Sequence, residues 1–117
     1  MEENFVRKIF YYKSYYLDFF GTLKDDAKKK FNWTLKLIAT LDRVPAKYLK
    51  HIKNSTGLYE IRVESAGNIF RVFCFFDKGK MIILINGFQK KSQKIPRKEI
   101  EMAEKLKKQY FDEKGNN

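Results

Sequence analysis

The chain has 117 residues, of which 44% are hydrophobic and 16% aromatic; this excludes an intrinsically disordered chain and leaves too little material for two separate cores. Lys and Arg number 25 against 14 Asp and Glu, and the formal net charge of +11 favours a polyanionic partner: nucleic acid, an anionic membrane face or an acidic protein. We expect residues 1–112 to form one domain, followed by a flexible tail over residues 113–117.

The first part of the chain predicts a strand and then a short helix. Residues 5–13 alternate loosely and are rich in β-branched and aromatic side chains, which is typical of a strand. Ser14 is suited to cap a helix that continues through Phe20, and Gly21 is suited to end it.

A longer amphipathic helix is expected from Asp25 to about Leu41. Apolar residues recur there at intervals of three and four, with lysines on the other side: Ala27, Phe31, Leu35, Ile38 and Leu41. Trp33 and Leu37 are expected to widen the buried stripe, and Pro45 follows the helix end. Residues 45–56 predict a short helical turn and a basic loop, which carries Lys47, Lys50, His51 and Lys53.

Three strands are expected next, over residues 58–65, 68–77 and 80–88. The short links Ala66-Gly67 and Lys78-Gly79 are suited to hairpins, so the strands form an antiparallel meander. The first part of the third strand, Met81 to Ile85, has no alternation. We therefore expect it to lie centrally in the sheet, apolar on both faces and covered by helices on one side.

A final helix begins near Pro96, after a basic loop over residues 89–94. One face of this helix is apolar and consists of Ile100, Ala103, Leu106 and Tyr110. The fold class predicted by this order of elements is α+β, with a C-terminal helix.

The two hairpin links predict a row of polar residues across the sheet. If each loop has two residues, Arg62 lies opposite Arg71, and Arg71 lies opposite Asn86, all on one face. Opposed like charges are destabilising, and a bridging RNA phosphate would relieve this cost. The alternative is that Glu60 and Glu64 neutralise the two arginines. Lysines just beyond the row favour the anion site: Lys90, Lys91 and Lys94.

The same strands resemble the HigB branch of the RelE/ParE toxin superfamily. The resemblance covers about residues 5–110, and its motif is an arginine strand, an arginine and aromatic strand, and a Gly-Phe-x-Lys-Lys-x-x-x-x-Pro link into a helix. The matching stretches are GLYEIR at 57–62, FRVFCFF at 70–76, INGFQKKSQKIP at 85–96, and then Glu99, Ile100 and Ala103.

This resemblance implies a RelE-like fold, in which an N-terminal helical hairpin packs on a small, twisted and mostly antiparallel sheet. It also implies a ribosome-dependent endoribonuclease that cleaves messenger RNA and thereby inhibits translation. The implied partners are the ribosome with its messenger RNA and a cognate, HigA-like, DNA-binding antitoxin. Operator DNA would be contacted only through the complex with that antitoxin.

The resemblance also assigns site residues. Arg62 and Arg71 match the family's basic strand positions, and Lys90 or Lys91 matches the basic group after the last strand. HigB-like sequences often have His before the Gly-Phe pair, whereas this chain has Asn86, which cannot titrate. The identity of the general acid therefore stays open.

Cleavage of RNA without a metal needs a base for the 2′-hydroxyl, charge stabilisation at phosphorus and an acid for the leaving 5′-oxygen. We expect the two arginines to grip the phosphate and Lys90 or Lys91 to transfer a proton, because neighbouring positive charges favour a neutral lysine. Glu60 is an alternative base, and His51 is a secondary candidate in a basic loop. We expect Asn86, Lys53 and Lys94 to contact RNA.

The sequence lacks the patterns of a metal site, a membrane span or a signal peptide. No Cys/His cluster or grouped carboxylates have metal-ligand spacing, so we expect no metal and no cofactor. No apolar stretch approaches roughly 20 residues, and residues 1–14 lack the features of a signal peptide. The lone Cys74 lies in an apolar run and is interpreted as a core residue. A cytoplasmic protein without a membrane partner is expected.

Two other functions compete with the nuclease. One is a ParE-like toxin that shares the fold and inhibits DNA gyrase without cutting RNA. The other is a non-catalytic nucleic-acid-binding module that uses the +11 charge alone. The basic set of Arg62, Arg71 and the Lys90-Lys91 pair favours the nuclease.

Overall fold

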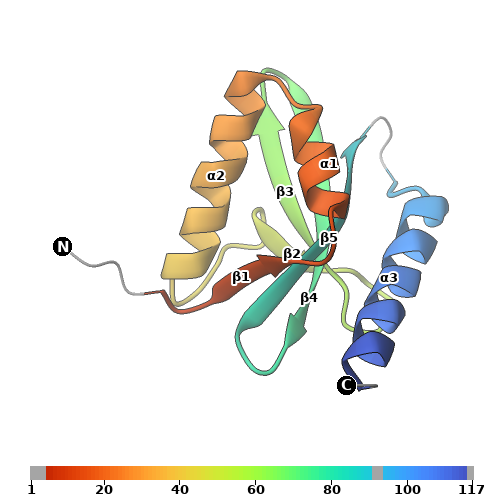
Figure 1. The fold of residues 1–117 in the computed structure, drawn as a ribbon. Helices are drawn as coiled ribbons and strands as arrows, with labels where there is room; N and C mark the ends of the chain where they lie inside the picture. The colour runs from red at the N-terminus through yellow and green to blue at the C-terminus, as the bar shows by residue number, and fades with distance from the viewer. Residues whose placement is uncertain (1–4, 91–93, 116–117) are drawn as a thin grey trace.

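The computed structural model of the chain describes residues 5–90 and 94–115. Within them the fold is α+β, with three helices and a five-stranded sheet (Figure 1). The elements are β1 Lys8–Tyr11, α1 Tyr15–Gly21, α2 Asp25–Thr40, β2 Leu49–His51, β3 Tyr59–Ser65, β4 Asn68–Asp77, β5 Met81–Lys90 and α3 Arg97–Gly115. None of these helices combines the length and the apolar composition needed to cross a membrane.

The strands form one mixed sheet in the order β1-β5-β4-β3-β2. The pairs β2-β3, β3-β4 and β4-β5 are antiparallel, as the expected meander requires, whereas β1 pairs with β5 in parallel. The expected sheet, mostly antiparallel, is therefore confirmed with one parallel edge. Two helices follow β1, so the expected N-terminal helical hairpin is matched only in part.

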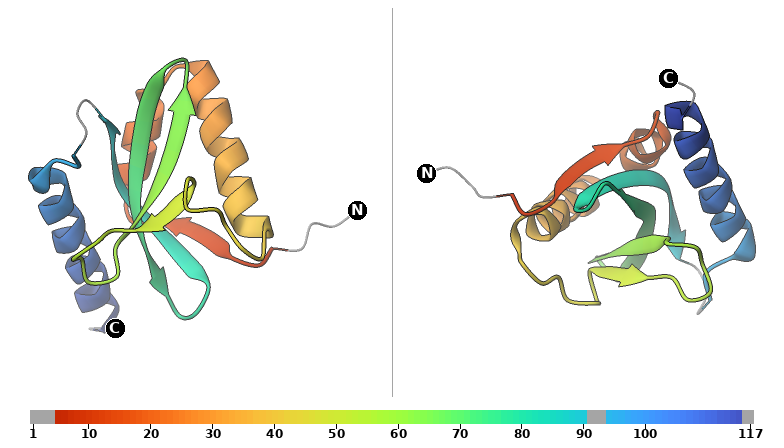
Figure 2. Two further views of the ribbon diagram at one scale, coloured as in Figure 1. Left: turned by 180° about the vertical axis from the view of Figure 1, so that it is seen from behind. Right: turned by 90° about the horizontal axis from the view of Figure 1, so that it is seen from below.

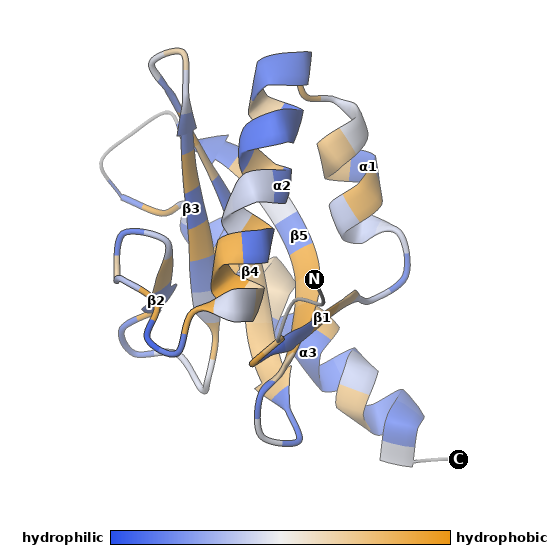
Figure 3. Ribbon diagram, turned by 90° about the vertical axis from the view of Figure 1, so that its left-hand side faces the viewer, coloured by the Kyte–Doolittle hydropathy of each residue, from blue (hydrophilic) through white to orange (hydrophobic). Residues whose placement is uncertain are grey.

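Helices cover both faces of this sheet. Helices α1 and α2 lie on one face and α3 on the other, as the views in Figures 1 and 2 show. Each face has its own buried cluster; Ile82 and Leu84 belong to the first, and Ile83 and Ile85 to the second. The unalternating run in β5 is thus central and covered on both sides, more completely than expected. Figure 3 shows β4 and the start of β5 as mostly hydrophobic between the helices.

Helix α2 confirms the predicted amphipathic pattern except for Trp33 and for Leu41, which lies just after the helix and is exposed. Ala27, Phe31 and Ile38 are buried, with Thr34 completing the central stripe. The hydroxyl of Thr34 donates to the carbonyl of Lys30 at 2.8 Å, which satisfies it within the helix. Trp33 lies beside this stripe and keeps 48% of its surface exposed, so the expectation that it widens the core is wrong.

Two local details differ from the sequence prediction. The Ser14 hydroxyl makes no cap bond to the backbone and instead donates to the Asp18 carboxylate at 3.0 Å. Residues 49–51 form β2 rather than a loop, after a single hydrogen-bonded turn at Pro45. A strand of three residues is too short to alternate visibly, and its partner β3 supplies the pairing.

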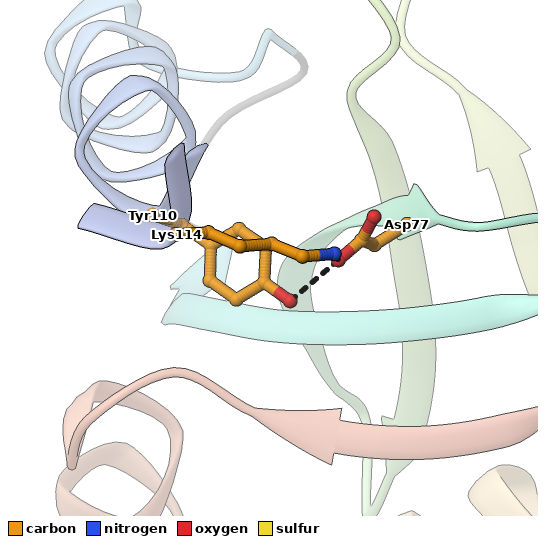
Figure 4. A network of polar contacts seen from close by, with 3 residues as sticks. All are labelled: Asp77, Tyr110 and Lys114. Atoms are coloured by element: carbon orange, nitrogen blue, oxygen red, sulfur yellow. Dashed lines mark hydrogen bonds and ion pairs between the residues drawn. The ribbon is translucent and has the colours of Figure 1, made fainter. Parts of the chain in front are cut away.

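Helix α3 runs to Gly115, so residues 113–115 of the expected tail belong to the helix. The helix continues this far because its last turns bind Asp77 at the end of β4 (Figure 4). The Asp77 carboxylate accepts a hydrogen bond from the Tyr110 hydroxyl at 2.7 Å and pairs with the Lys114 ammonium at 2.6 Å. These bonds hold the last turns of α3 against the sheet.

The core prediction for Cys74 is confirmed. Its side chain is fully buried in the cluster beneath α1 and α2, and this burial raises the pKa of the thiol far above its ordinary value. The thiol therefore stays protonated and acts as a small apolar group.

Candidate functional site

Two arginines face each other across the β3-β4 pair, as predicted. The register places Arg62 directly opposite Arg71, and Ser65 opposite Asn68 at the hairpin end. The link Ala66-Gly67 has two residues with φ of 51° and 80°, the left-handed values of a tight hairpin turn. This short turn fixes the register of the whole pair.

The third member of the predicted row is misplaced. Asp77 pairs with Met81, so the link contains three residues, and a bulge between Val72 and Cys74 shifts the register once more. As a result, Arg71 lies opposite Phe88 rather than Asn86. The sequence cannot distinguish a two-residue from a three-residue link when both contain the same Lys-Gly pair, and the bulge adds a second displacement.

Asn86 instead holds the start of α3. Its side-chain amide donates to the backbone carbonyl of Glu99 at 3.4 Å and to the Glu99 carboxylate at 3.3 Å. Asn86 is buried, so these bonds stabilise the junction between β5 and the last helix. Its direct contact with the arginine pair, expected from the sequence, is not found.

Each arginine is neutralised by a glutamate on its own sheet face. Arg71 pairs through Nη1 with Oε1 of Glu60, and both side chains are about nine-tenths buried. Arg62 pairs through Nη2 with Oε1 of Glu64 at 2.6 Å, and this pair is partly exposed. The alternative prediction, in which the two glutamates neutralise the arginines, therefore describes this structure. It differs in one respect, because Arg71 is buried rather than solvated.

The buried ion pair leaves polar atoms without a partner. Among the described residues, Nε of Arg71 and Oε2 of Glu60 make no hydrogen bond, and Oδ1 of Asn86 makes none either. A buried polar atom left in this state costs about 1–3 kcal/mol. Both atoms are buried, so they mark an unsatisfied donor and an unsatisfied acceptor within the ion pair rather than an accessible surface.

Aromatic rings form the floor beside Arg71. Phe73 and Phe75 are fully buried in the cluster beneath α3, and the rings of Phe73 and Phe88 are 5.5 Å apart. Phe73 and Phe75 therefore have a packing role, and neither is available to stack on a base. Their burial excludes water from the inner side of the Glu60-Arg71 pair.

Two lysines share the arginine face. Lys90 ends β5 opposite Ile69, and the strand period places it on the same face as Phe88. Lys50 in β2 pairs with Glu60, so its side chain also belongs to this face. The sequence predicted Lys50 to lie in a loop, and only the pairing of β2 with β3 shows that it belongs to this face. Lys91 lies outside the described residues, and Lys94 is exposed before α3.

His51 and Lys53 do not join this group. His51 pairs with Tyr59, and their rings meet edge to face at 5.2 Å, on the face that carries α1 and α2. Lys53 is exposed in the loop after β2. The structure therefore brings together Arg62, Arg71, Glu60 and Lys90, and it separates His51 from them.

The arginine face is open at the hairpin end. Helix α3 packs over β5 and β4, and the left panel of Figure 2 shows the hairpin end of β3 and β4 with no helix in front. Among the described residues, no group of three or more His, Cys, Asp or Glu side chains is arranged to hold a metal ion. The open face therefore offers cations and one buried carboxylate.

Comparison with known proteins identifies one family. The sequence model described as "Phage derived protein Gp49-like (DUF891)" matches residues 18–108, which include α2, the β3-β4-β5 meander and most of α3. The curated proteins gave no significant match.

Proposed function

The chain belongs to the Gp49-like family of phage-derived proteins, a toxin family within the RelE/HigB-like superfamily of toxin-antitoxin systems, and we propose from this that it cleaves messenger RNA on the ribosome. Membership also implies a cognate antitoxin. In the proposed scheme that antitoxin is HigA-like, covers the open arginine face and contacts operator DNA on behalf of the complex.

The observation that carries this proposal is the arrangement of Arg71. The Glu60 carboxylate holds its guanidinium on the sheet face directly opposite Arg62, while Nε remains without a partner among the described residues. Such a fixed cation stabilises negative charge that develops on a phosphate, and it needs little reorganisation at the moment of reaction. Arg62, which is more exposed, supplies the second guanidinium.

The proposed reaction is an internal displacement at phosphorus. The 2′-oxygen of a ribose attacks the adjacent phosphorus, the bond to the 5′-oxygen breaks, and a 2′,3′-cyclic phosphate and a 5′-hydroxyl result. Glu60 or a neutral lysine accepts the proton of the 2′-hydroxyl. Lys90 or Lys91 supplies the proton to the leaving 5′-oxygen. The ribosome positions the messenger RNA strand.

Primer extension on messenger RNA after brief induction tests the nuclease. The expected result is a set of new 5′ ends within translated codons. Arg62→Ala should reduce cleavage about a hundredfold, because it removes one charge-stabilising group from a side chain that is partly exposed. Arg43→Ala is the matched control, since it removes an exposed arginine far from β3 in sequence and should leave cleavage unchanged.

Two outcomes would contradict the proposal. Intact transcripts accompanied by DNA damage would indicate a gyrase inhibitor like the ParE branch, and normal growth on expression would leave only a nucleic-acid-binding module. Lys90→Ala and Lys91→Ala separate the two lysines: the one that transfers a proton should change the pH profile of cleavage, and the other should not.

A further inference from the structure

A second basic and aromatic site lies at the free edge of β3, outside the Glu60-Arg71 pair. It is a pocket of about 160 Å³ between α2, the turn before β2 and the outer half of β3. Its lining residues are Lys30, Thr34, Lys47, Tyr48, Arg62, Val63 and Glu64. Three cations therefore face one carboxylate, and that carboxylate already pairs with Arg62.

Exposed aromatic rings adjoin the pocket. Trp33 is half-exposed, and its ring lies 5.8 Å from that of Tyr48 in an edge-to-face arrangement. The Lys30 ammonium lies 5.1 Å from the centre of the Trp33 ring, and the Lys47 ammonium lies 4.9 Å from that of Tyr48. An accessible indole with cations around it is the combination that single-stranded nucleic acids bind, by base stacking and phosphate contact together.

The backbone adds a donor at the same edge. The Arg62 N–H donates to the Tyr48 carbonyl at 3.0 Å, and β2 begins only at the next residue, Leu49. The strand period directs the Glu64 N–H to the same edge, beyond the end of β2. This N–H and the two lysines that line the pocket are donors of the kind that a phosphate oxygen accepts.

We propose that this pocket binds one nucleotide of single-stranded RNA, with its base stacked on Trp33 and its phosphate held by Lys30 and Lys47. The choice of RNA rests on the proposed function, and the site extends it to a strand that crosses the free edge of β3. Arg62 belongs to both places, because it lines the pocket and lies opposite Arg71. A duplex would leave the indole unstacked, and an acidic peptide would engage only the lysines.

The chain supplies its own probe for this site, because Trp33 is its single tryptophan. The test titrates the full chain with a 2′-O-methylated oligouridylate, which has no free 2′-hydroxyl and therefore cannot undergo the proposed cleavage. Saturable quenching of tryptophan fluorescence is the expected result, and inorganic phosphate alone should quench far less. Binding of the oligonucleotide by anisotropy without any change in tryptophan fluorescence would overturn the proposal.

Charge variants test the phosphate contact. Lys30→Ala/Lys47→Ala should weaken oligonucleotide binding about tenfold and lower the slope of log affinity against log salt by about 1.4, or roughly 0.7 for each lost phosphate contact. Lys29→Ala is the matched control, because Lys29 is an exposed neighbour on α2 that does not line the pocket. If the slope of log affinity against log salt changes no more in the double variant than in Lys29→Ala, the phosphate site is refuted.

Stacking is tested separately. Trp33→Ala should weaken binding about tenfold, whereas Trp33→Phe, which keeps a ring, should retain most of the affinity. Because Trp33 is half-exposed, both variants should unfold near the parent temperature. A polyglutamate peptide that quenches Trp33 as strongly as the oligonucleotide would make this an acidic-protein site instead. Quenching by RNA with no new 5′ ends in cells would uphold the pocket and reject the nuclease.

Discussion

At the scale of single residues, the burial of the Glu60-Arg71 pair determines how the site can be altered. Both side chains are about nine-tenths buried, so removal of one charge leaves the other uncompensated. Removal of both charges together leaves no buried ion. Variants that change activity must therefore be distinguished from variants that change folding.

Single and double variants at this pair should differ in stability. Arg71→Ala should lower the free energy of unfolding by about 3–5 kcal/mol, because the Glu60 carboxylate would lose its only described partner. Glu60→Gln/Arg71→Met should remain close to the parent in urea denaturation and yet fail to cleave RNA. A stable, fully active double variant would remove the pair from the proposed mechanism.

Gly87 is a second residue whose neighbourhood fixes its identity. A Cβ atom built there would lie 2.6 Å from the ring of Phe19 in α1, whereas one built at Gly21 would meet no atom within 4 Å. Gly87→Ala should therefore cost about 1–3 kcal/mol through overpacking. Gly21→Ala should be neutral or stabilise by up to about 1 kcal/mol. Thermal unfolding of both variants checks this; equal midpoints would contradict it.

At the scale of elements, the Asp77 carboxylate contributes to holding the end of α3. Hydrogen bonds from Lys114 and Tyr110 hold the pKa of Asp77 below its ordinary value of 3.8. A lowered pKa in the folded state means that this contribution is present above pH 3.8 and is lost as the pH falls below it. Burial, followed by the bond to Asp77, raises the pKa of Tyr110 to about 12, so its contribution is lost above pH 10.

Asp77→Asn should therefore loosen the end of α3. The expected loss is about 1 kcal/mol at neutral pH, because Lys114 is partly exposed and the pair is screened. The variant should also show a weaker decline of stability between pH 4 and pH 2 than the parent, which denaturation at several pH values measures. If stability declines between pH 4 and pH 2 as steeply in the variant as in the parent, Asp77 does not anchor the helix.

The elements also show what the sequence could predict. Strand β4 and the Ala66-Gly67 turn follow from alternation and turn chemistry, and they correctly place Arg62 opposite Arg71. Asn86 was misplaced because the second link has three residues and β4-β5 contains a bulge. Such features depend on packing against neighbouring layers, which local patterns do not encode.

The exposed site was hidden from sequence reasoning for a related reason. Trp33 falls within a window of apolar residues, and the helical period alone assigns it to the core. Thr34 occupies the buried position instead, since its hydroxyl is satisfied by the Lys30 carbonyl. Tyr48, with Lys47 over its ring, reaches Trp33 only because β2 returns the chain to the edge of β3.

At the scale of the whole molecule, both proposed sites lie along one edge and one end of the sheet. Helices α1 and α2 cover one face and α3 covers part of the other, which leaves the outer half of β3 accessible. Arg62 lies between the two sites. An RNA strand that follows this edge would contact particular lysines and arginines, rather than being attracted only by the net charge of +11.

The parallel pairing of β1 with β5 joins distant parts of the chain. Lys8 lies opposite Met81, so β1 finds its neighbour only after residue 81 has been synthesised. Long-range pairings of this kind form late and slowly. A nascent chain that ends before residue 81 should therefore remain protease-sensitive, because β1 still lacks its neighbour in the sheet.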